Sequence, residues 1–414
     1  MKFAPLLPQL DQQVWILAAG RLLSQTGSGL TFFYLPIFFV NQVGLTSTSV
    51  GVALSSASVS GVVGRVLGGS MTDSTFWGRR RTLLLAVAVS AIAALIIAIA
   101  NDFPSLVVGN LVMGMGVGLY WPATESTVAD LSTPAQRNEA YAITRLADNV
   151  GLSLGVVVGG ALIAIANLYR ALFVIDAVSF LIFFGVVYRA IPESAQGKER
   201  GQHGAQGWLI ALKDQRLLIY IMVNIMITTY LAQVNTVLPL YLKNFAQQGK
   251  GFSEVVISGL FAWNLTLSVL TQLPLARYLN RLSRPRVLMV SACAWAIGFV
   301  LVGLMGMATN LGLLWAIVAL GVLAIAAVIY APAASSLVAG IAPDSLRGVY
   351  LSINSLCWAV GYFVGPLIGG IVLDQTPEVA HAYWVGLAGS VAIALLILRV
   401  LDQRLQVTEG TSLK

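Results

Sequence analysis

Long apolar stretches alternate with short polar segments along the whole chain. Each stretch reaches the ~20 residues that an α-helix needs to cross the hydrocarbon core of a membrane. The stretches are too long and too evenly apolar for barrel strands, and only a helix satisfies every backbone amide within its own segment. The pattern predicts twelve transmembrane helices, at residues 13–40, 49–72, 82–101, 105–129, 139–165, 170–190, 215–243, 252–276, 287–307, 310–339, 348–373 and 380–402.

The composition agrees with an all-α integral membrane protein. Of the 414 residues, 57% are hydrophobic and 10% are charged, and the mean hydropathy is +0.83. A water-soluble chain of this size cannot hide so much apolar surface. We expect Cys293 and Cys357 to be packing residues and His203 and His381 to lie in loops, so no metal site or other cofactor is expected.

Basic residues are concentrated at one set of helix ends. If both termini are cytoplasmic, 18 of the 24 lysines and arginines fall in cytoplasmic segments, and only Arg170, Lys243 and Lys250 fall on the opposite face. Since cytoplasmic loops are rich in Lys and Arg, this predicts a multi-pass protein of the inner or plasma membrane with both termini inside. The net charge of +7 is then a topology signal, so we expect the lipid bilayer as partner, no nucleic acid, and a monomer.

The two halves of the chain are repeats of each other. Residues 120–160 align with residues 330–370 without a gap, and 14 of the 41 positions are identical, including a Pro, an Arg and four Gly positions. Helix 1 aligns with helix 7 at an offset of 203 residues. A polar, Gly-rich segment at the midpoint is typical of a linker. We therefore predict two pseudo-symmetric six-helix bundles, at residues 1–191 and 215–414, joined by a cytoplasmic linker at residues 192–214.

The loop between helices 2 and 3 carries a recognisable motif. The segment GGSMTDSTFWGRRR (68–81) resembles the signature loop of the major facilitator superfamily, with Gly69, Asp73, Gly78, Arg79 and Arg80 at the matching positions. The sequence has two extra residues after the aspartate, and a second copy (280–286) has Asn280 in the aspartate position. The resemblance covers the whole chain and implies a secondary transporter that works by alternating access.

Two glycine runs refine the resemblance. GLSLGVVVGG (151–160) and GYFVGPLIGG (361–370) resemble a motif of drug:proton antiporters, although Val156 replaces the proline of the first run. Asn110 stands where helix 4 of proton-linked members usually has an arginine. Small residues spaced by four also let helices pack closely, whatever is carried, so both interpretations stay open.

Several charges fall inside the predicted helices of the first half. Charges inside a membrane cost free energy, so they usually find partners or a function. Arg145 and Asp148 are also i,i+3 neighbours. The equivalent positions of the second half are uncharged. The predicted charge layer comprises Arg21, Arg65, Glu125, Arg145 and Asp148.

Two interpretations of these carboxylates are open. In one, the charges form ion pairs and cytoplasmic gate contacts; Arg65 and residues at helix ends fit this role best. In the other, Asp148 or Glu125 takes up and releases the coupling proton. Asp176, in helix 6, is expected to be structural. The gate and signature-loop residues are Gly69, Asp73, Gly78, Arg79, Arg80, Asp130, Arg137 and Arg347.

The resemblance also gives Asp73 a specific role. It implies that this carboxylate meets the N-terminus of helix 11, just after Arg347, when the cytoplasmic side closes, because negative charge is favoured at a helix N-terminus. Gly69 would let the two helices approach. Asp73→Asn is then expected to shift the population toward the inward-facing state. We expect Arg79, Arg80 and Arg81 to pair with local carboxylates.

Polar side chains follow one stripe on helix 1 and the equivalent stripe on helix 7. The resemblance implies that these helices line a central cavity. Amides, hydroxyls and aromatics with few charges suit a neutral or amphipathic organic substrate, whereas ordinary packing is the alternative for each aromatic. The cavity candidates are Gln25, Ser28, Phe32, Tyr120, Trp121, Asn224, Thr228, Asn235, Tyr330 and Asn354.

The sequence thus predicts a secondary transporter of small organic molecules, with proton-coupled export of drugs or metabolites as the leading function. Uptake or facilitated diffusion of a metabolite, lipid flipping and a channel are alternatives. A membrane enzyme is not expected, because the chain offers no buried nucleophile and base or metal set.

Overall fold

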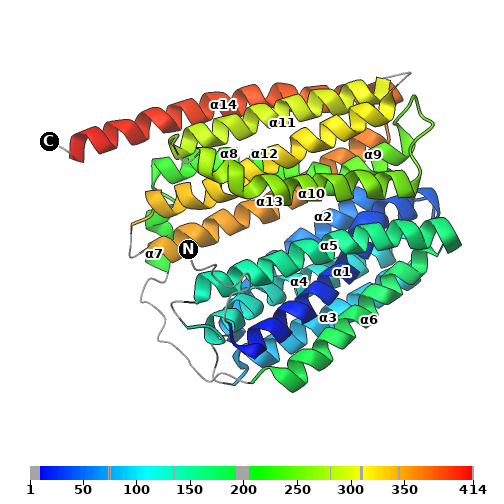
Figure 1. Cartoon of the computed structure of the whole chain (residues 1–414), viewed down its shortest axis with the longest axis horizontal. Coiled ribbons are helices and arrows are strands. Elements are labelled where there is room, and N and C mark those ends of the chain that lie inside the picture. Colours follow the sequence, from blue (N-terminus) through cyan, green and yellow to red (C-terminus); the bar gives the residue numbers. More distant parts are fainter. Residues whose placement is uncertain are drawn as a thin grey trace, which may run out of the picture. The chain divides into compact units, whose positions relative to one another are not determined.

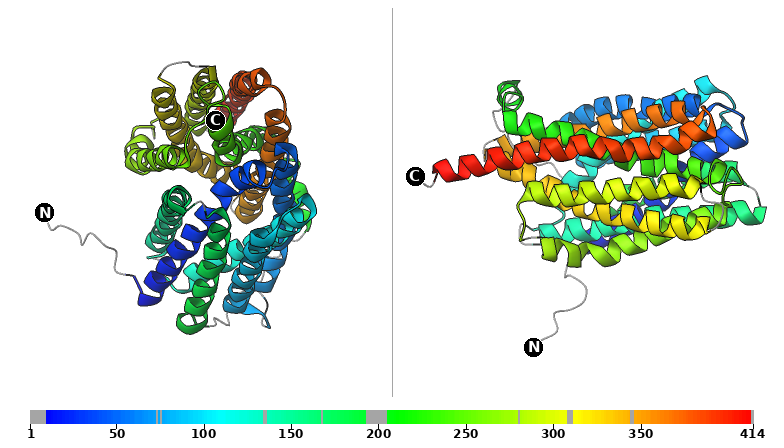
Figure 2. Two further views of the ribbon diagram at one scale, coloured as in Figure 1. Left: turned by 90° about the vertical axis from the view of Figure 1, so that its right-hand side faces the viewer. Right: turned by 90° about the horizontal axis from the view of Figure 1, so that it is seen from above.

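The fold is helical almost throughout. The computed structural model describes residues 10–72, 74, 76–133, 136–166, 168–192, 205–279, 281–307, 311–343 and 346–412. These form two compact units, Met1–Leu45 with Val52–Glu199 (unit 1) and Thr46–Gly51 with Arg200–Lys414 (unit 2). Figures 1 and 2 show the helices of each unit as a bundle of rods.

The first-half helices match the predicted stretches. They are α1 (Gln12–Asn41), α2 (Ser47–Thr72), α3 (Gly78–Ile99), α4 (Phe103–Asp130), α5 (Arg137–Ala166) and α6 (Tyr169–Ala190). Within unit 1, α1 packs against α5 and α6, and α3 packs against α4 and α6.

The second-half helices also match, with two additions. They are α7 (Ala205–Ala211), α8 (Gln215–Ala232), the π-helical turn η1 (Gln233–Val237), α9 (Leu238–Asn244), α10 (Glu254–Leu279), α11 (Arg284–Met307), α12 (Gly312–Ile341), α13 (Arg347–Leu373) and α14 (Pro377–Ser412). The predicted seventh helix is the continuous run α8–η1–α9. The short helix α7 lies in the predicted linker, and no sequence pattern indicated it.

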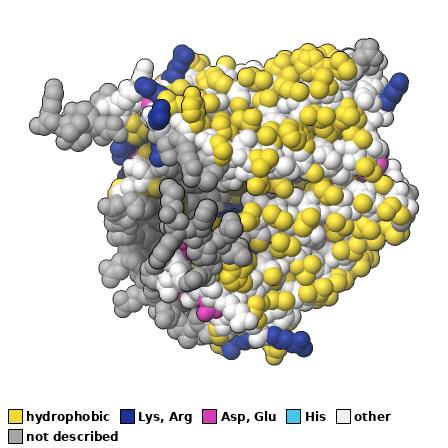
Figure 3. Space-filling view, viewed as in Figure 1, with side chains coloured by type: hydrophobic (Ala, Val, Ile, Leu, Met, Phe, Trp, Pro, Cys, Tyr) yellow, Lys and Arg dark blue, Asp and Glu magenta, His cyan; other side chains and the backbone are white. Residues whose placement is uncertain are grey.

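Among the described residues, eleven helical segments are long and apolar enough to cross a membrane. The 30-residue helix α1 is not among them, since its stripe of Arg21, Gln25 and Ser28 lowers its hydropathy. Many large apolar side chains are exposed, such as Ile165, which is 85% exposed. Figure 3 shows apolar side chains spread over the visible face, with Lys and Arg toward its margins. Exposed apolar surface on this scale is explained by contact with lipid.

The glycine runs serve close helix packing. A Cβ at Gly151 would lie 2.4 Å from the carbonyl oxygen of Leu22, and a Cβ at Gly155 would lie 2.2 Å from that of Thr26. On α13, a Cβ at Gly361 would lie 2.4 Å from Thr228 Oγ1. The structure therefore confirms the packing role of both runs: α5 closes on α1, and α13 closes on α8.

Replacing Gly155 with alanine is expected to lower the free energy of unfolding by about 1–3 kcal/mol, because the new methyl group meets backbone that cannot swing away. Gly185 on α6 is the matched control, since a Cβ there meets nothing within 4 Å. Gly185→Ala should be neutral or stabilising by up to about 1 kcal/mol. Thermal unfolding in detergent measures both; equal midpoints for the two variants would contradict the packing role.

The first turn of α2 clusters with unit 2, where Asp374 caps it. The backbone amides of Ser47 and Thr48 donate to the two carboxylate oxygens of Asp374, each at 2.7 Å. A carboxylate at a helix N-terminus stabilises the free amides there. Burial raises the pKa of Asp374, but hydrogen bonds from Thr48 and Ser47 outweigh it and hold that pKa below its usual value.

Candidate functional site

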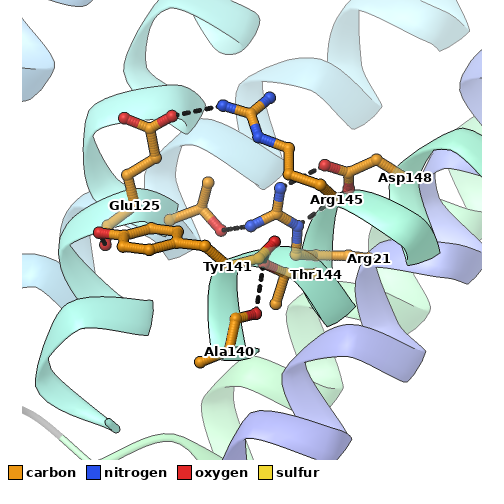
Figure 4. Close-up of polar contacts among 8 residues, drawn as sticks. Arg21, Glu125, Ala140, Tyr141, Thr144, Arg145 and Asp148 are labelled. Atoms are coloured by element: carbon orange, nitrogen blue, oxygen red, sulfur yellow. Dashed lines mark hydrogen bonds and ion pairs between the residues drawn. The ribbon is translucent and has the colours of Figure 1, made fainter. Parts of the chain in front are cut away.

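A buried ion pair joins α1 to α5 in unit 1. Arg21 Nε donates to Asp148 Oδ1 at 2.9 Å, and Nη2 donates to Oδ2, so the contact is bidentate (Figure 4). The side chains of Arg21 and Asp148 are only 1% and 6% exposed. Nη1 of Arg21 donates to Thr124 Oγ1 of α4 at 3.3 Å. One guanidinium therefore ties three helices together.

Aromatic rings of α4 lie against this guanidinium. Arg21 Cζ lies 5.9 Å from the ring centroid of Tyr120 and 5.8 Å from that of Trp121. A cation near a ring face is attracted by the ring quadrupole, more strongly where water is excluded. Tyr120 is buried, and Trp121 is half-buried. These two cavity candidates therefore belong to the surroundings of the ion pair.

A second ion pair lies beside the first and is more exposed. Arg145 Nη2 donates to Glu125 Oε1 at 2.7 Å, and the two side chains are 53% and 47% exposed. Arg145 Cζ also lies 4.7 Å from the ring centroid of Trp121. Arg145 and Asp148 are thus neighbours in sequence that pair with different partners, not with each other (Figure 4).

Arg65 completes the predicted charge layer. Arg65 is half-buried on α2, and its guanidinium group interacts electrostatically with Glu125. All five charges of the predicted layer therefore lie in unit 1. Three are the arginines, and two are the carboxylates of Glu125 and Asp148.

The arginines of the signature loop bind mostly carbonyl groups. Arg79 pairs with Asp130 and also donates to the Ser126 carbonyl at 3.1 Å. Arg80 donates to the Tyr188 carbonyl and lies over the Tyr188 ring. Arg81 donates to the Phe76 carbonyl at 2.6 Å. The expectation that all three pair with carboxylates is confirmed for Arg79 and is wrong for Arg81, whose bond to a carbonyl restrains the loop instead.

The glycines of the loop have different roles. Gly78 begins α3 with a φ of +66°, a left-handed conformation that favours glycine. A Cβ at Gly69 would meet nothing within 4 Å in the described part of the chain, so none of the described residues packs closely at this position. Gly68 is the close-packed residue, with its Cβ position 3.0 Å from Leu119 Cα of α4.

Three predicted gate residues are described in part or not at all. Asp73 lies outside the described residues. His203 and Asn280, which are not gate residues, also lie outside them. Arg137 and Arg347 are the first residues of α5 and α13, and only their backbones are described. The role of Asp73 as a latch stays a prediction.

An uncharged polar network occupies the equivalent place in unit 2. Asn224, at the repeat position of Arg21, donates through Nδ2 to Asn354 Oδ1 at 3.0 Å and accepts from the Tyr330 hydroxyl. The Tyr220 hydroxyl also donates to Asn354 Oδ1. Asn224 and Tyr330 are each 1% exposed. A charged cluster in one unit is thus matched by amides and phenols in the other.

Aromatic rings continue from this network along α13. The Tyr330 and Trp358 ring centroids lie 6.3 Å apart, and Trp358 stacks on Tyr362 at 6.2 Å with an interplanar angle of 19°. Asn235 is exposed and donates to the Tyr362 hydroxyl at 2.7 Å. Trp358 occupies the repeat position of Asp148, so an indole stands where unit 1 has its buried carboxylate.

The polar stripes on α1 and on α8–η1 are only partly accessible. Phe32 and Asn235 are exposed, and Gln25 is half-buried, as is Asn354 of α13. Ser28 is 7% exposed and Thr228 is 0% exposed. Thr228 donates to the Cys357 carbonyl at 2.9 Å, so it packs α8 on α13 and does not line an accessible surface in this structure.

One cysteine and one histidine differ from expectation. Cys357 is buried but Cys293 is exposed, so only the first is a core residue. His381 lies inside α14, not in a loop, and its Nδ1 is hydrogen-bonded to the Tyr241 hydroxyl at 2.7 Å. In the described part of the chain, no group of three or more His, Cys, Asp or Glu side chains could hold a metal ion.

Sequence reasoning did not identify Asp214, which caps α8. Asp214 Oδ1 accepts from the Arg216 amide at 2.9 Å, and Oδ2 accepts from the Tyr350 hydroxyl of α13 at 2.9 Å. Burial raises the pKa of Asp214, but hydrogen bonds from Arg216 and Tyr350 outweigh it and hold that pKa below its usual value. An aspartate just before an apolar run is a recognisable cap signal that could have found it.

Asp214→Ala is expected to lower the free energy of unfolding by about 1 kcal/mol at neutral pH through loss of the cap. A carboxyl whose folded-state pKa is depressed stabilises above its unfolded pKa of about 3.9, and this stabilisation is lost as the pH falls through the folded pKa. The difference in thermal midpoint between wild type and Asp214→Ala should therefore shrink below about pH 4. Asp214→Asn, which keeps an acceptor oxygen, should lose less stability than Asp214→Ala at neutral pH. A difference in thermal midpoint between wild type and Asp214→Ala that does not depend on pH would contradict this role.

Known proteins resemble this chain over most of its length. The multidrug resistance protein MdtH of Edwardsiella ictaluri (strain 93-146) is 25% identical over 394 residues, covering 92% of each chain. The Na(+), Li(+), K(+)/H(+) antiporter of Planococcus maritimus is 25% identical over 379 residues, covering 84% of this chain and 86% of the antiporter. The solved structure of the nucleoside transporter NupG matches the fold with a TM-score of 0.79 at 15% identity, covering 95% of this chain and 99% of NupG.

The family profile described as Major Facilitator Superfamily matches residues 17–263 and 244–412. These matches together span nearly the whole chain. The family and its relatives are membrane transporters of small molecules, not enzymes. The chain therefore belongs to the major facilitator superfamily and is a multi-pass secondary transporter.

Proposed function

We propose that this transporter exports small amphipathic organic molecules in exchange for protons. The proton is the proposed coupling ion, and alternating access of the two units is the proposed cycle. The concentration of Lys and Arg at one set of helix ends supports a cell-membrane orientation with both termini cytoplasmic.

The observation that carries the proposal is the contrast between the two units. Unit 1 holds a buried arginine and aspartate, whereas the equivalent positions of unit 2 hold Asn224 and Trp358, beside a network of asparagines and tyrosines. Buried charges inside a membrane are costly, so they usually mark an ion or proton path. Amides and stacked aromatic rings suit an organic molecule with a flat apolar face and a few polar groups.

A proton and Arg21 compete for the same carboxylate in this proposal. In the structure both oxygens of Asp148 accept from the guanidinium, so a proton can bind only by displacing one of these hydrogen bonds. A proton that binds Asp148 removes the counter-charge of Arg21, and the guanidinium must then find another acceptor. Glu125 is the second candidate for proton binding, because its pairing with Arg145 is half-exposed and easily rearranged.

The names of relatives support this direction of transport. Besides the multidrug resistance protein MdtH, a relative from Staphylococcus aureus (strain MSSA476) is named quinolone resistance protein NorA and is 20% identical over 390 residues. The name of the Planococcus maritimus relative supports a second candidate, exchange of alkali cations for protons. Metabolite uptake, facilitated diffusion and lipid flipping are further alternatives on the same fold.

The test is flux in proteoliposomes of the purified protein with a quinolone as the probe. An imposed proton gradient should drive the probe against its concentration gradient, and a protonophore should abolish this accumulation. Sodium replaces the quinolone in a parallel arm, which tests cation exchange. Saturable quinolone flux that ignores the proton gradient would identify facilitated diffusion and contradict proton coupling.

A further inference from the structure

A carboxyl group outside the charge cluster is completely buried in unit 1. Asp176 lies on α6, seven residues after the start of the helix, and is 0% exposed. Its Oδ2 is hydrogen-bonded to Thr31 Oγ1 of α1 at 2.6 Å. Its Oδ1 has no hydrogen-bond partner among the described residues. A buried polar atom without a partner is costly, and costlier when it carries charge.

The backbone of α1 covers this carboxyl group closely. A Cβ at Gly27 would lie 2.6 Å from Asp176 Oδ1 and 2.9 Å from Asp176 Cα. The neighbouring Ser179 hydroxyl donates its proton to the Asp176 backbone carbonyl at 2.7 Å, so it does not donate to Oδ1. The packing of α1 on α6 thus excludes bulk water from Oδ1 without providing a donor.

No basic side chain in the described part of unit 1 pairs with Asp176. On α1, Arg21 is ten residues before Thr31, about 15 Å along the helix, and is bound to Asp148. On α6, Arg170 binds the carbonyls of Ala98 and Ala100. The helices α1, α3, α5 and α6 pack around this site. Their remaining charged residues lie toward the other end of each helix. These residues are Arg79, Arg80, Arg81, Arg137, Glu139, Arg145, Asp148 and Arg189.

We propose that Asp176 is a proton-binding site, separate from the Arg21–Asp148 pair, and that it is a neutral carboxylic acid in this packing of α1 on α6. Thr31 Oγ1 donates to Oδ2 in the structure; in the neutral form the proton on Oδ2 is donated to Thr31 Oγ1 instead, the threonine hydroxyl turns its own proton away, and Oδ1 is an uncharged carbonyl oxygen. Unit 1 then contains two buried carboxyls with different partners: Asp148 is bound to Arg21, and Asp176 carries a proton. Loss of the Asp176 proton requires α1 to move off α6 and admit water.

Infrared spectroscopy of the purified protein tests this site without any transport assay. At neutral pH the wild type should show the carbonyl stretch of a protonated carboxylic acid, shifted in D₂O, and Asp176→Asn should lack this band. Asp148→Asn is the matched control and should keep it. If the wild type and Asp176→Asn have the same spectrum in this region, Asp176 is ionised and the proposal is overturned.

A second variant covers the case in which Asp176→Asn does not fold. Thr31→Val removes the hydrogen bond to Oδ2 but keeps the carboxyl group. The carbonyl band should therefore persist, shifted to higher frequency. An unmoved band would contradict the assignment to Asp176. Sodium chloride added at constant pH distinguishes a proton from a metal cation at the same oxygens: the band should not change, and its loss would show that the site takes a metal cation instead.

Discussion

Arg21→Ala is expected to destabilise unit 1 by about 3–5 kcal/mol and to abolish transport. The substitution leaves Asp148, only 6% exposed, as a buried charge without its counter-ion. Breaking one side of a buried ion pair costs about this much, because the remaining charge is uncompensated. It also removes the hydrogen bond that links α1 to Thr124 of α4. Thermal unfolding in detergent measures the first effect, and quinolone flux in proteoliposomes measures the second.

Arg145→Ala is the matched control for Arg21→Ala. Its partner Glu125 is 47% exposed, and exposed ion pairs contribute about 0–1 kcal/mol. The double variant Arg21→Met with Asp148→Leu separates stability from function. Replacing both charges by apolar side chains of similar volume is often neutral for stability, so the double variant should fold and still not transport. A double variant that transports like wild type would show that the pair is only structural.

The helices were predictable because membrane solvation leaves so few alternatives. Each of the twelve apolar stretches is helical in the structure, within a few residues at each end except for α14, which continues ten residues beyond the predicted end at residue 402. The exceptions are α7, which is too short to be apolar over a membrane length, and η1, where one extra residue per turn leaves no compositional mark. Hydropathy detects the need to satisfy backbone amides in lipid, and it is insensitive to local changes in helix pitch.

The charge cluster was predictable as a set but not as pairs. Depth along each helix placed Arg21, Glu125, Arg145 and Asp148 at one level. Which arginine meets which carboxylate depends on helix rotation, and the i,i+3 spacing of Arg145 and Asp148 favoured a pair that does not form. Rotation is set by the glycine contacts of α5 on α1; the sequence indicated that these glycines could serve close packing, but not which residues they would meet.

Exposure of the cavity candidates was the least predictable property. Repeat alignment correctly gave Thr228 the same place on α8 that Gln25 has on α1. Gly361 lets α13 close on Thr228, and its repeat partner Gly151 lets α5 close on Gln25, but only the shorter Thr228 side chain is completely covered, whereas Gln25 is half-buried. A repeat conserves backbone position, but the neighbouring side chains decide which atoms reach solvent.

Asp148→Asn is expected to abolish proton-driven accumulation of the quinolone while sparing its exchange across the membrane without a gradient. The amide is close to the carboxyl in shape and can still accept one hydrogen bond from Arg21, but it cannot exchange a proton. Coupling requires a carboxylate whose protonation changes its partner, and the bidentate contact with Arg21 makes Asp148 such a group. Because the variant leaves Arg21 without a counter-charge, its folding is checked first by thermal unfolding.

Glu125→Gln is the comparison that assigns the coupling residue. Glu125 belongs to the half-exposed pair, so its replacement should cost little stability and should preserve accumulation if Asp148 is the coupling site. Loss of accumulation in Glu125→Gln but not in Asp148→Asn would assign coupling to Glu125. Accumulation by both variants at the wild-type level would exclude the charge cluster of unit 1 from proton coupling, because no other carboxylate in that cluster is left to carry the proton.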